Sequence, residues 1–151
     1  MERMILENGF VITLDPDRRV IENGSVVIED DHIIDVGKAS DIEKRYPSDQ
    51  TIDASNKIIM PGLVNAHNHN NEVILRGLSV DTIKEERRNR SGYYWDIDIL
   101  RNLDKEACYS AGMLCALEMI RSGITCTQNS HYINFHNDAI DGIAQSIADS
   151  G

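Results

Sequence analysis

Two histidines two residues apart, His67 and His69, are the side chains of this sequence best placed to do chemistry together. They follow the apolar run Ile58–Val64, which predicts a buried strand with Pro61-Gly62 marking its entry. Residues i and i+2 of a strand point to the same face, so both imidazoles could chelate one divalent ion at roughly 2.0–2.1 Å from each nitrogen. We expect zinc first and iron second, because both suit imidazole. The alternative is a pair of polar loop histidines.

The elements that must position this pair alternate between strand and helix. In order, the pattern predicts a strand at 61–66, a long polar connection at 70–103 with a helix near 82–90, a helix at 105–121, a strand at 124–127 and a helix at 139–148. Asp104 is the expected N-cap of the helix at 105–121, and Ser122-Gly123 ends it. Connections as long as 70–103 are usually functional in compact domains.

The helix at 105–121 should bury one broad face against a sheet. Cys108 and Cys115, seven residues apart, share a helix face and are expected to be buried as small hydrophobic residues. Leu117 and Ile120 widen the apolar surface. Glu118 is expected in a buried ion pair or hydrogen bond, since it lies on the inward side.

Residues 2–37 read as short strands separated by turn residues. Asn8-Gly9 predicts a hairpin turn between strands at 4–7 and 10–14, and Asp15-Pro16-Asp17 closes the second strand. The further expected elements are strands at 25–29 and 32–37, a helix at 39–46 and a strand at 51–53.

Length and composition narrow the class of protein. At 151 residues the chain is the size of one ordinary domain, and its net charge of −10 argues against nucleic acid or a membrane as a partner. No stretch approaches the ~18–20 apolar residues of a membrane span. Three cysteines, an odd number without close metal-type spacing, give no sign of a disulfide framework, so a cytoplasmic location is expected.

The residues around the histidine pair carry a wider resemblance. Residues 52–69 read Ile-Asp-Ala-Ser-Asn-Lys-Ile-Ile-Met-Pro-Gly-Leu-Val-Asn-Ala-His-Asn-His, and Leu75-Arg76-Gly77-Leu78 follows shortly after. The first segment resembles the start of the barrel in the amidohydrolase superfamily. The second resembles the branch of metal-dependent aminohydrolases and chlorohydrolases that act on purines, pyrimidines, adenosine derivatives and triazines.

The resemblance implies an α/β fold in two parts. Residues 1–57 would be part of a small β-sandwich domain, and residues 58–151 the N-terminal part of a metal-dependent hydrolase barrel of the TIM type, (β/α)8. Only the first two β/α units would lie in this chain, so the barrel would be incomplete and we expect an N-terminal piece of a longer enzyme. Two more histidines and an aspartate would come from later strands. No catalytic residue is expected in this segment.

The implied reaction is hydrolysis of a non-peptide C–N bond. A metal-activated water would deaminate or dechlorinate a nitrogen heterocycle, and the chain alone is expected to be inactive. The implied partners are a small heterocyclic substrate, the remainder of the enzyme chain and, at full length, further copies in a homo-oligomer. The alternatives are a non-catalytic truncated remnant or binding module of the same fold, and an amidohydrolase cleaving an amide or cyclic imide.

Four residues are candidates for binding substrate. Arg76 could reach the substrate mouth or, as the favoured reading, fix its loop through a carboxylate. Trp95 could stack on a flat heterocycle, as in relatives, or anchor its loop. Asn129 and His131 follow the second barrel strand, where barrel enzymes build their sites, although His131 could equally be a neutral surface histidine. Asn65, on the same face as His67, could orient the metal site or bridge water.

Overall fold

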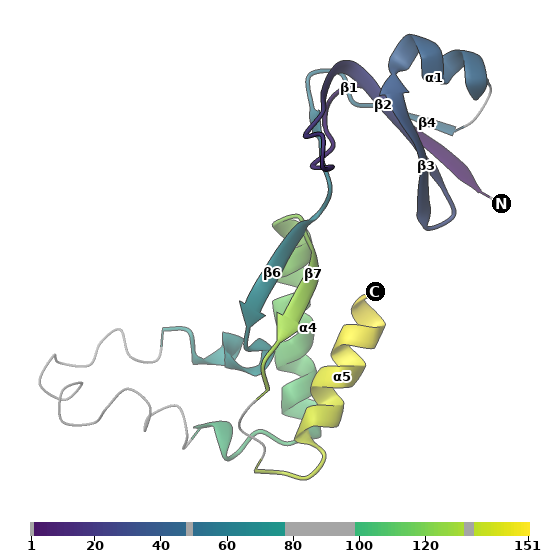
Figure 1. Cartoon of the computed structure of the whole chain (residues 1–151). Helices are drawn as coiled ribbons and strands as arrows, with labels where there is room; N and C mark the ends of the chain where they lie inside the picture. Colours follow the sequence, from purple (N-terminus) through teal and green to yellow (C-terminus); the bar gives the residue numbers. More distant parts are fainter. Residues whose placement is uncertain (1, 48–49, 78–98, 132–134) are drawn as a thin grey trace, which may run out of the picture. The chain divides into compact units, whose positions relative to one another are not determined.

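The computed structural model describes residues 2–47, 50–77, 99–131 and 135–151 (Figure 1). The chain divides into two compact units, Met1–Pro61 and Gly62–Gly151. The helix expected near residues 82–90 and the candidate Trp95 lie outside the described residues. No described helix is long and apolar enough to cross a membrane.

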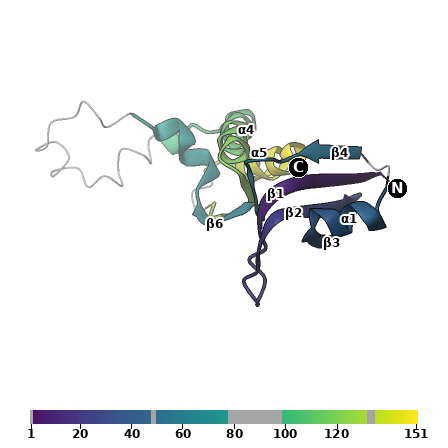
Figure 2. The ribbon, with the colours of Figure 1, turned by 90° about the horizontal axis from the view of Figure 1, so that it is seen from above.

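The first unit is a mixed sheet with one helix packed on it (Figure 2). Its strands follow the order β3-β2-β1-β4, and β5 also pairs with β1. Antiparallel pairing joins β1 to β2 and β2 to β3, whereas β4 and β5 run parallel to β1. Ile5, Val27 and Ile42 form the core, with Tyr46 packed against it. The elements are β1 (Arg3–Ile12), β2 (Val20–Glu29), β3 (His32–Lys38), α1 (Ala39–Arg45), β4 (Gln50–Asp53) and β5 (Ile58–Ile59).

The hairpin predicted at Asn8-Gly9 is wrong. β1 runs through both residues without reversing, and its register with β2 shifts on either side of Gly9. Asn8 has φ +64°, a conformation that serves a bulge as well as a hairpin turn. Asn23-Gly24 lies in the same irregularity, and β2 begins at Val20 rather than at residue 25.

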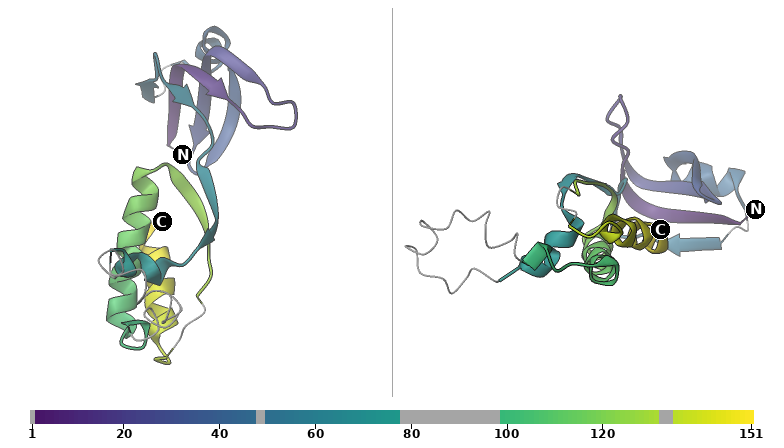
Figure 3. Two further views of the ribbon diagram at one scale, coloured as in Figure 1. Left: turned by 90° about the vertical axis from the view of Figure 1, so that its left-hand side faces the viewer. Right: turned by 90° about the horizontal axis from the view of Figure 1, so that it is seen from below.

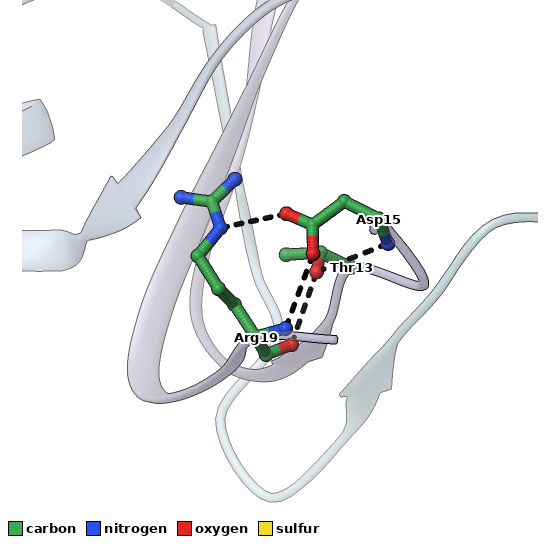
Figure 4. A network of polar contacts seen from close by, with 3 residues as sticks. All are labelled: Thr13, Asp15 and Arg19. Carbon is green, nitrogen blue, oxygen red and sulfur yellow. Dashed lines mark hydrogen bonds and ion pairs between the residues drawn. The ribbon is translucent and has the colours of Figure 1, made fainter. Parts of the chain in front are cut away.

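The loop that does reverse the chain joins β1 to β2 and is held by Thr13, Asp15 and Arg19 (Figure 4). The Arg19 Nε donates to Asp15 Oδ2 at 2.6 Å, and the Arg19 backbone N–H donates to Asp15 Oδ1 at 3.2 Å. The Thr13 hydroxyl donates to the Arg19 carbonyl at 3.1 Å. Hydrogen bonding from Arg19 holds the pKa of Asp15 below its ordinary value. The predicted turn at Asp15 is therefore confirmed.

The second unit contains a two-stranded parallel sheet with helices beside it (Figures 1 and 3). Leu100, Leu103, Cys108, Ala139 and Ile143 form its core, at the junction of α4 and α5. The elements are β6 (Leu63–Asn68), the 3-10 helix η1 (Asn70–Leu75), α4 (Lys105–Arg121), β7 (Ile124–Asn129) and α5 (Ala139–Ser150).

The ends of α4 are as predicted. The Asp104 side chain caps it by accepting the Ala107 N–H at 2.9 Å. Ser122 is the C-cap, and Gly123 follows with φ +75°. The strand at 124–127 and the helix at 139–148 are also confirmed, each extending two residues further.

The single buried strand predicted over Ile58–Val64 is wrong. Pro61 has no N–H to donate to a strand ladder, and the run divides there into β5 of the first unit and β6 of the second. Ile58 is 62% exposed and Val64 69%. Two strands offer too little structure to cover both faces of a sheet, so the expected burial does not arise within the described residues.

The predicted face of α4 is only partly correct. Cys108 and Cys115 are buried as expected, but Leu117 and Ile120 are more than half exposed. α4 packs against both α5 and η1. The residues that it buries are small: Cys108, Ala111, Gly112, Cys115 and Ala116. The loop expected to begin at residue 70 starts instead with η1.

Candidate metal centre

The strand β6 delivers both histidines to one point. His67 lies near the end of β6 and His69 directly after it. Their Nε2 atoms are 3.1 Å apart, the ring centroids are 5.0 Å apart, and the rings meet at 76°. An ion about 2.05 Å from each nitrogen would make an N–metal–N angle of about 100°, between octahedral and tetrahedral values. Two nitrogen lone pairs that face each other so closely repel unless a proton or a cation lies between them.

The second nitrogen of His69 is held by the neighbouring strand end. Its Nδ1 lies 2.6 Å from the carbonyl oxygen of Ser130. A carbonyl oxygen can only accept, so Nδ1 carries the proton and Nε2 keeps its lone pair for a metal. This is the arrangement that metal-binding histidines usually have.

His67 is held through its backbone. Its N–H donates to Asn65 Oδ1 at 3.3 Å, within the same strand. This contact places the Asn65 side chain beside the His67 backbone, and the two readings of Asn65 stay predictions.

Two asparagines that follow the pair are buried rather than exposed. Asn70 and Asn71 are 1% and 2% exposed. The Asn70 backbone N–H donates to Asn129 Oδ1 at 2.9 Å, and Asn68 Nδ2 donates to Asn70 Oδ1 at 2.5 Å. Asn129, the predicted substrate ligand, thus binds the chain next to His69. The sequence did not indicate this role, although a run of asparagines after a predicted metal pair was a signal that could have raised it.

Arg76 binds a carboxylate of α4, as the favoured reading predicted. Its two terminal nitrogens donate to the two oxygens of Glu118, each at 2.7 Å. These hydrogen bonds raise the pKa of Arg76 and lower that of Glu118. The ion pair expected for Glu118 is confirmed, but its burial is wrong, since the Glu118 side chain is 42% exposed. The pair fastens the end of η1 to α4.

The remaining residues considered from the sequence are His131, Trp95, His32 and His136. Both ring nitrogens of His131 are buried, and the residue as a whole is half-buried. Its two readings, as a substrate ligand and as a surface histidine, stay predictions. Trp95 is not described. His32 and His136, read as structural or exposed, are both exposed.

The histidine pair opens into a cavity of about 880 Å³ between β6, η1 and α4. His67, His69, Arg76, Glu118 and Cys115 are among its lining residues. Within the described residues, no group of three or more His, Cys, Asp or Glu side chains could hold an ion. The pair is nevertheless a fitting donor set for part of a zinc or iron site, because it supplies two convergent nitrogens, one with a fixed tautomer.

Comparison with known proteins adds independent findings. The model of the Amidohydrolase family matches residues 58–150. A 5'-deoxyadenosine deaminase of Methanosarcina barkeri is 33% identical over 151 residues, which are 100% of this chain and 32% of that protein. The chain thus spans about a third of the length of this curated relative.

Two solved structures are similar as well. A zinc-bound adenosine deaminase from Xanthomonas campestris superposes with a TM-score of 0.78 at 25% identity, over 97% of this chain and 31% of that one. A mutant atrazine chlorohydrolase from Arthrobacter aurescens TC1, complexed with zinc and atraton, superposes with a TM-score of 0.66 at 28% identity, over 97% and 33%. The mixed α/β structure therefore matches part of each of these larger proteins.

Proposed function

The chain belongs to the amidohydrolase family, and from this membership we propose that it is the N-terminal segment of a metal-dependent hydrolase in which His67 and His69 hold one divalent ion. The observation that carries the proposal is the 3.1 Å approach of the two Nε2 atoms beside a His69 ring whose Nδ1 binds a carbonyl. Zinc is the first candidate, since the named relatives of solved structure contain it.

The proposed fold follows the same membership. Residues 1–57 would be part of a small β-sandwich, and residues 58–151 would supply the first two β/α units of a (β/α)8 barrel. The parallel pairing of β6 with β7, each followed by a helix, is consistent with two such units. The missing metal ligands would come from the remainder of the same enzyme.

The proposed reaction is hydrolysis of a non-peptide C–N bond in a small nitrogen heterocycle. Deamination is favoured by the two deaminase relatives, and dechlorination is the second candidate because of the chlorohydrolase. When bound, a divalent ion lowers the pKa of water towards ~7 and so makes a nucleophile at neutral pH.

The described residues would bind and orient. His67 and His69 would donate their Nε2 lone pairs, and the Ser130 carbonyl would keep His69 in the required tautomer. Arg76 donates hydrogen bonds to both carboxylate oxygens of Glu118, which balances its charge. We therefore propose that Arg76 forms part of the wall of the cavity and does not bind an anionic substrate. Stacking by Trp95 and hydrogen bonding by His131 stay predictions.

Cobalt titration of the 151-residue chain tests the metal assignment. We expect one Co²⁺ per chain, seen by visible absorption and calorimetry, and at least about tenfold weaker binding in His67→Ala and His69→Ala. His32→Ala is the matched control, because His32 is an exposed histidine of the first unit. Wild-type affinity in His67→Ala, or a complete gene product that binds no ion, would refute the assignment.

Product analysis separates the two reactions. With the complete product of the gene, ammonia release from a deoxyadenosine substrate supports deamination, and chloride release from a chlorotriazine supports dechlorination. Turnover of neither, with metal bound, would favour a binding module or an amide-cleaving amidohydrolase instead. The 151-residue chain by itself is expected to turn over none of these substrates.

A further inference from the structure

We propose that Asn129 and Ser130 form a clamp that sets the position and the tautomer of His69, which makes Asn129 a positioning residue for the metal ligand. The proposal rests on the proposed metal-binding role of His69. It differs from the expectation that Asn129 contacts substrate.

Three hydrogen bonds join the clamp to three consecutive residues. The Ser130 N–H donates to the Asn68 carbonyl at 2.7 Å. The His69 Nδ1–H donates to the Ser130 carbonyl at 2.6 Å. The Asn70 N–H donates to Asn129 Oδ1 at 2.9 Å. The backbone is therefore held on both sides of His69, and the imidazole is held as well.

The side chain of Asn129 stands in for an acceptor that the strand ladder does not supply. The register of β6 against β7 shifts between Asn65 and Asn68, and pairing ends with Asn68 opposite Asn129. The chain leaves the sheet after Asn68, and Asn70 is the first residue of η1, so the Asn70 N–H has no strand partner in the β6–β7 ladder. Because Asn70 is 1% exposed, this N–H needs a protein acceptor, and Asn129 Oδ1 provides it.

The opposite side of Asn70 is also fixed. Asn68 Nδ2 donates to Asn70 Oδ1 at 2.5 Å and lies 3.2 Å from Cys115 Sγ of α4. Loss of the Asn129 acceptor would free Asn70 on one side only. The segment would then shift away from β7, and the hydrogen bond from His69 to Ser130 would weaken with it.

The chemistry of the clamp requires an oxygen acceptor at position 129, not an amide as such. Aspartate presents an oxygen at the same reach and can accept the Asn70 N–H, whereas leucine of similar size cannot. Asn129→Asp is therefore the conservative variant and Asn129→Leu the disruptive one. Asn137→Leu is the matched control, since Asn137 is an exposed asparagine of the same unit.

The test measures the tautomer and the metal affinity separately. In the metal-free chain, side-chain ¹⁵N spectra should show His69 protonated at Nδ1 in the wild type and in Asn129→Asp, and a tautomer mixture in Asn129→Leu. Co²⁺ affinity should fall about 10–100-fold in Asn129→Leu and stay within about threefold in Asn129→Asp and Asn137→Leu. Circular dichroism verifies that each variant keeps its helices.

The outcomes separate the clamp from the proposed function. An Asn129→Leu chain with wild-type tautomer and affinity overturns the clamp, while loss of binding in His67→Ala leaves the metal assignment standing. If Asn129→Leu does not fold, Asn129→Asp decides, because lost affinity or a mixed tautomer there also overturns the clamp. If the 151-residue wild type binds no ion, the complete gene product decides the metal assignment, and the tautomer spectra alone support or overturn the clamp.

Discussion

Replacing Gly142 with alanine should destabilise the second unit, although alanine is the better helix former. Gly142 lies in α5 where this helix crosses α4. A Cβ at this position would lie 2.1 Å from the Lys105 carbonyl oxygen and 2.9 Å from the Tyr109 nitrogen. Both are backbone atoms of α4, so no side-chain rotation can relieve the clash.

The size of the effect follows from these distances. Ordinary contacts between heavy atoms begin near 3.5 Å, so the helices must part by more than about 1 Å. Overpacking of this kind costs about 1–3 kcal/mol, and the rigid backbone places it near 3 kcal/mol. Alanine regains about 1 kcal/mol of helix propensity over glycine. The net loss is about 2 kcal/mol, or about 4–8 °C in Tm for a chain of this length.

Urea unfolding followed by circular dichroism measures this loss, because α4 and α5 make up most of the described helix. Ala144→Gly, at an exposed position of α5, measures the difference in helix propensity between alanine and glycine without any change in packing between helices. Its expected cost is about 1 kcal/mol. A Gly142→Ala variant more stable than the wild type by about 1 kcal/mol would refute the close approach of α5 to α4 at Gly142.

Two further results are expected. Arg76→Leu should raise the pKa of Glu118 towards its ordinary value. The same substitution should speed amide hydrogen exchange in η1 but not in α4, because the ion pair fastens η1 to that helix. Unchanged exchange in η1 would contradict this role. Asp15 should titrate below its ordinary value of 3.8, and Arg19→Leu should raise its midpoint. Because the folded pKa is depressed, the stabilisation is present above the unfolded pKa and is lost as the pH falls through the folded one. A midpoint unmoved by Arg19→Leu would show that Arg19 is not the cause.

Local patterns predicted the elements of the second unit well. The ends of α4 depend on Asp104 and Ser122-Gly123, whose capping preferences act within one helical turn. The sequence also predicted that Arg76 would bind a carboxylate, and the structure shows that this carboxylate belongs to Glu118. The caps of α4 need little information from elsewhere in the chain, whereas the partner of Arg76 lies 42 residues away in sequence.

Pairing between distant segments was harder to predict. Asn8-Gly9 suits a hairpin turn and a bulge equally, and only pairing of β1 with β2 decided for the bulge. The division of Ile58–Val64 between two units likewise depends on partners: β1 for Ile58–Ile59, and β7 for the strand from Leu63.

The sequence by itself determined the chemistry available at the histidine pair. The types and i, i+2 spacing of His67 and His69 were sufficient to predict convergent imidazoles, because alternation along a strand is a local property. Tertiary structure decided what holds them: Ser130 sets the proton of His69, and Asn129 holds the chain beside it. These partners lie about sixty residues away in sequence, and only the parallel pairing of β6 with β7 brings them together.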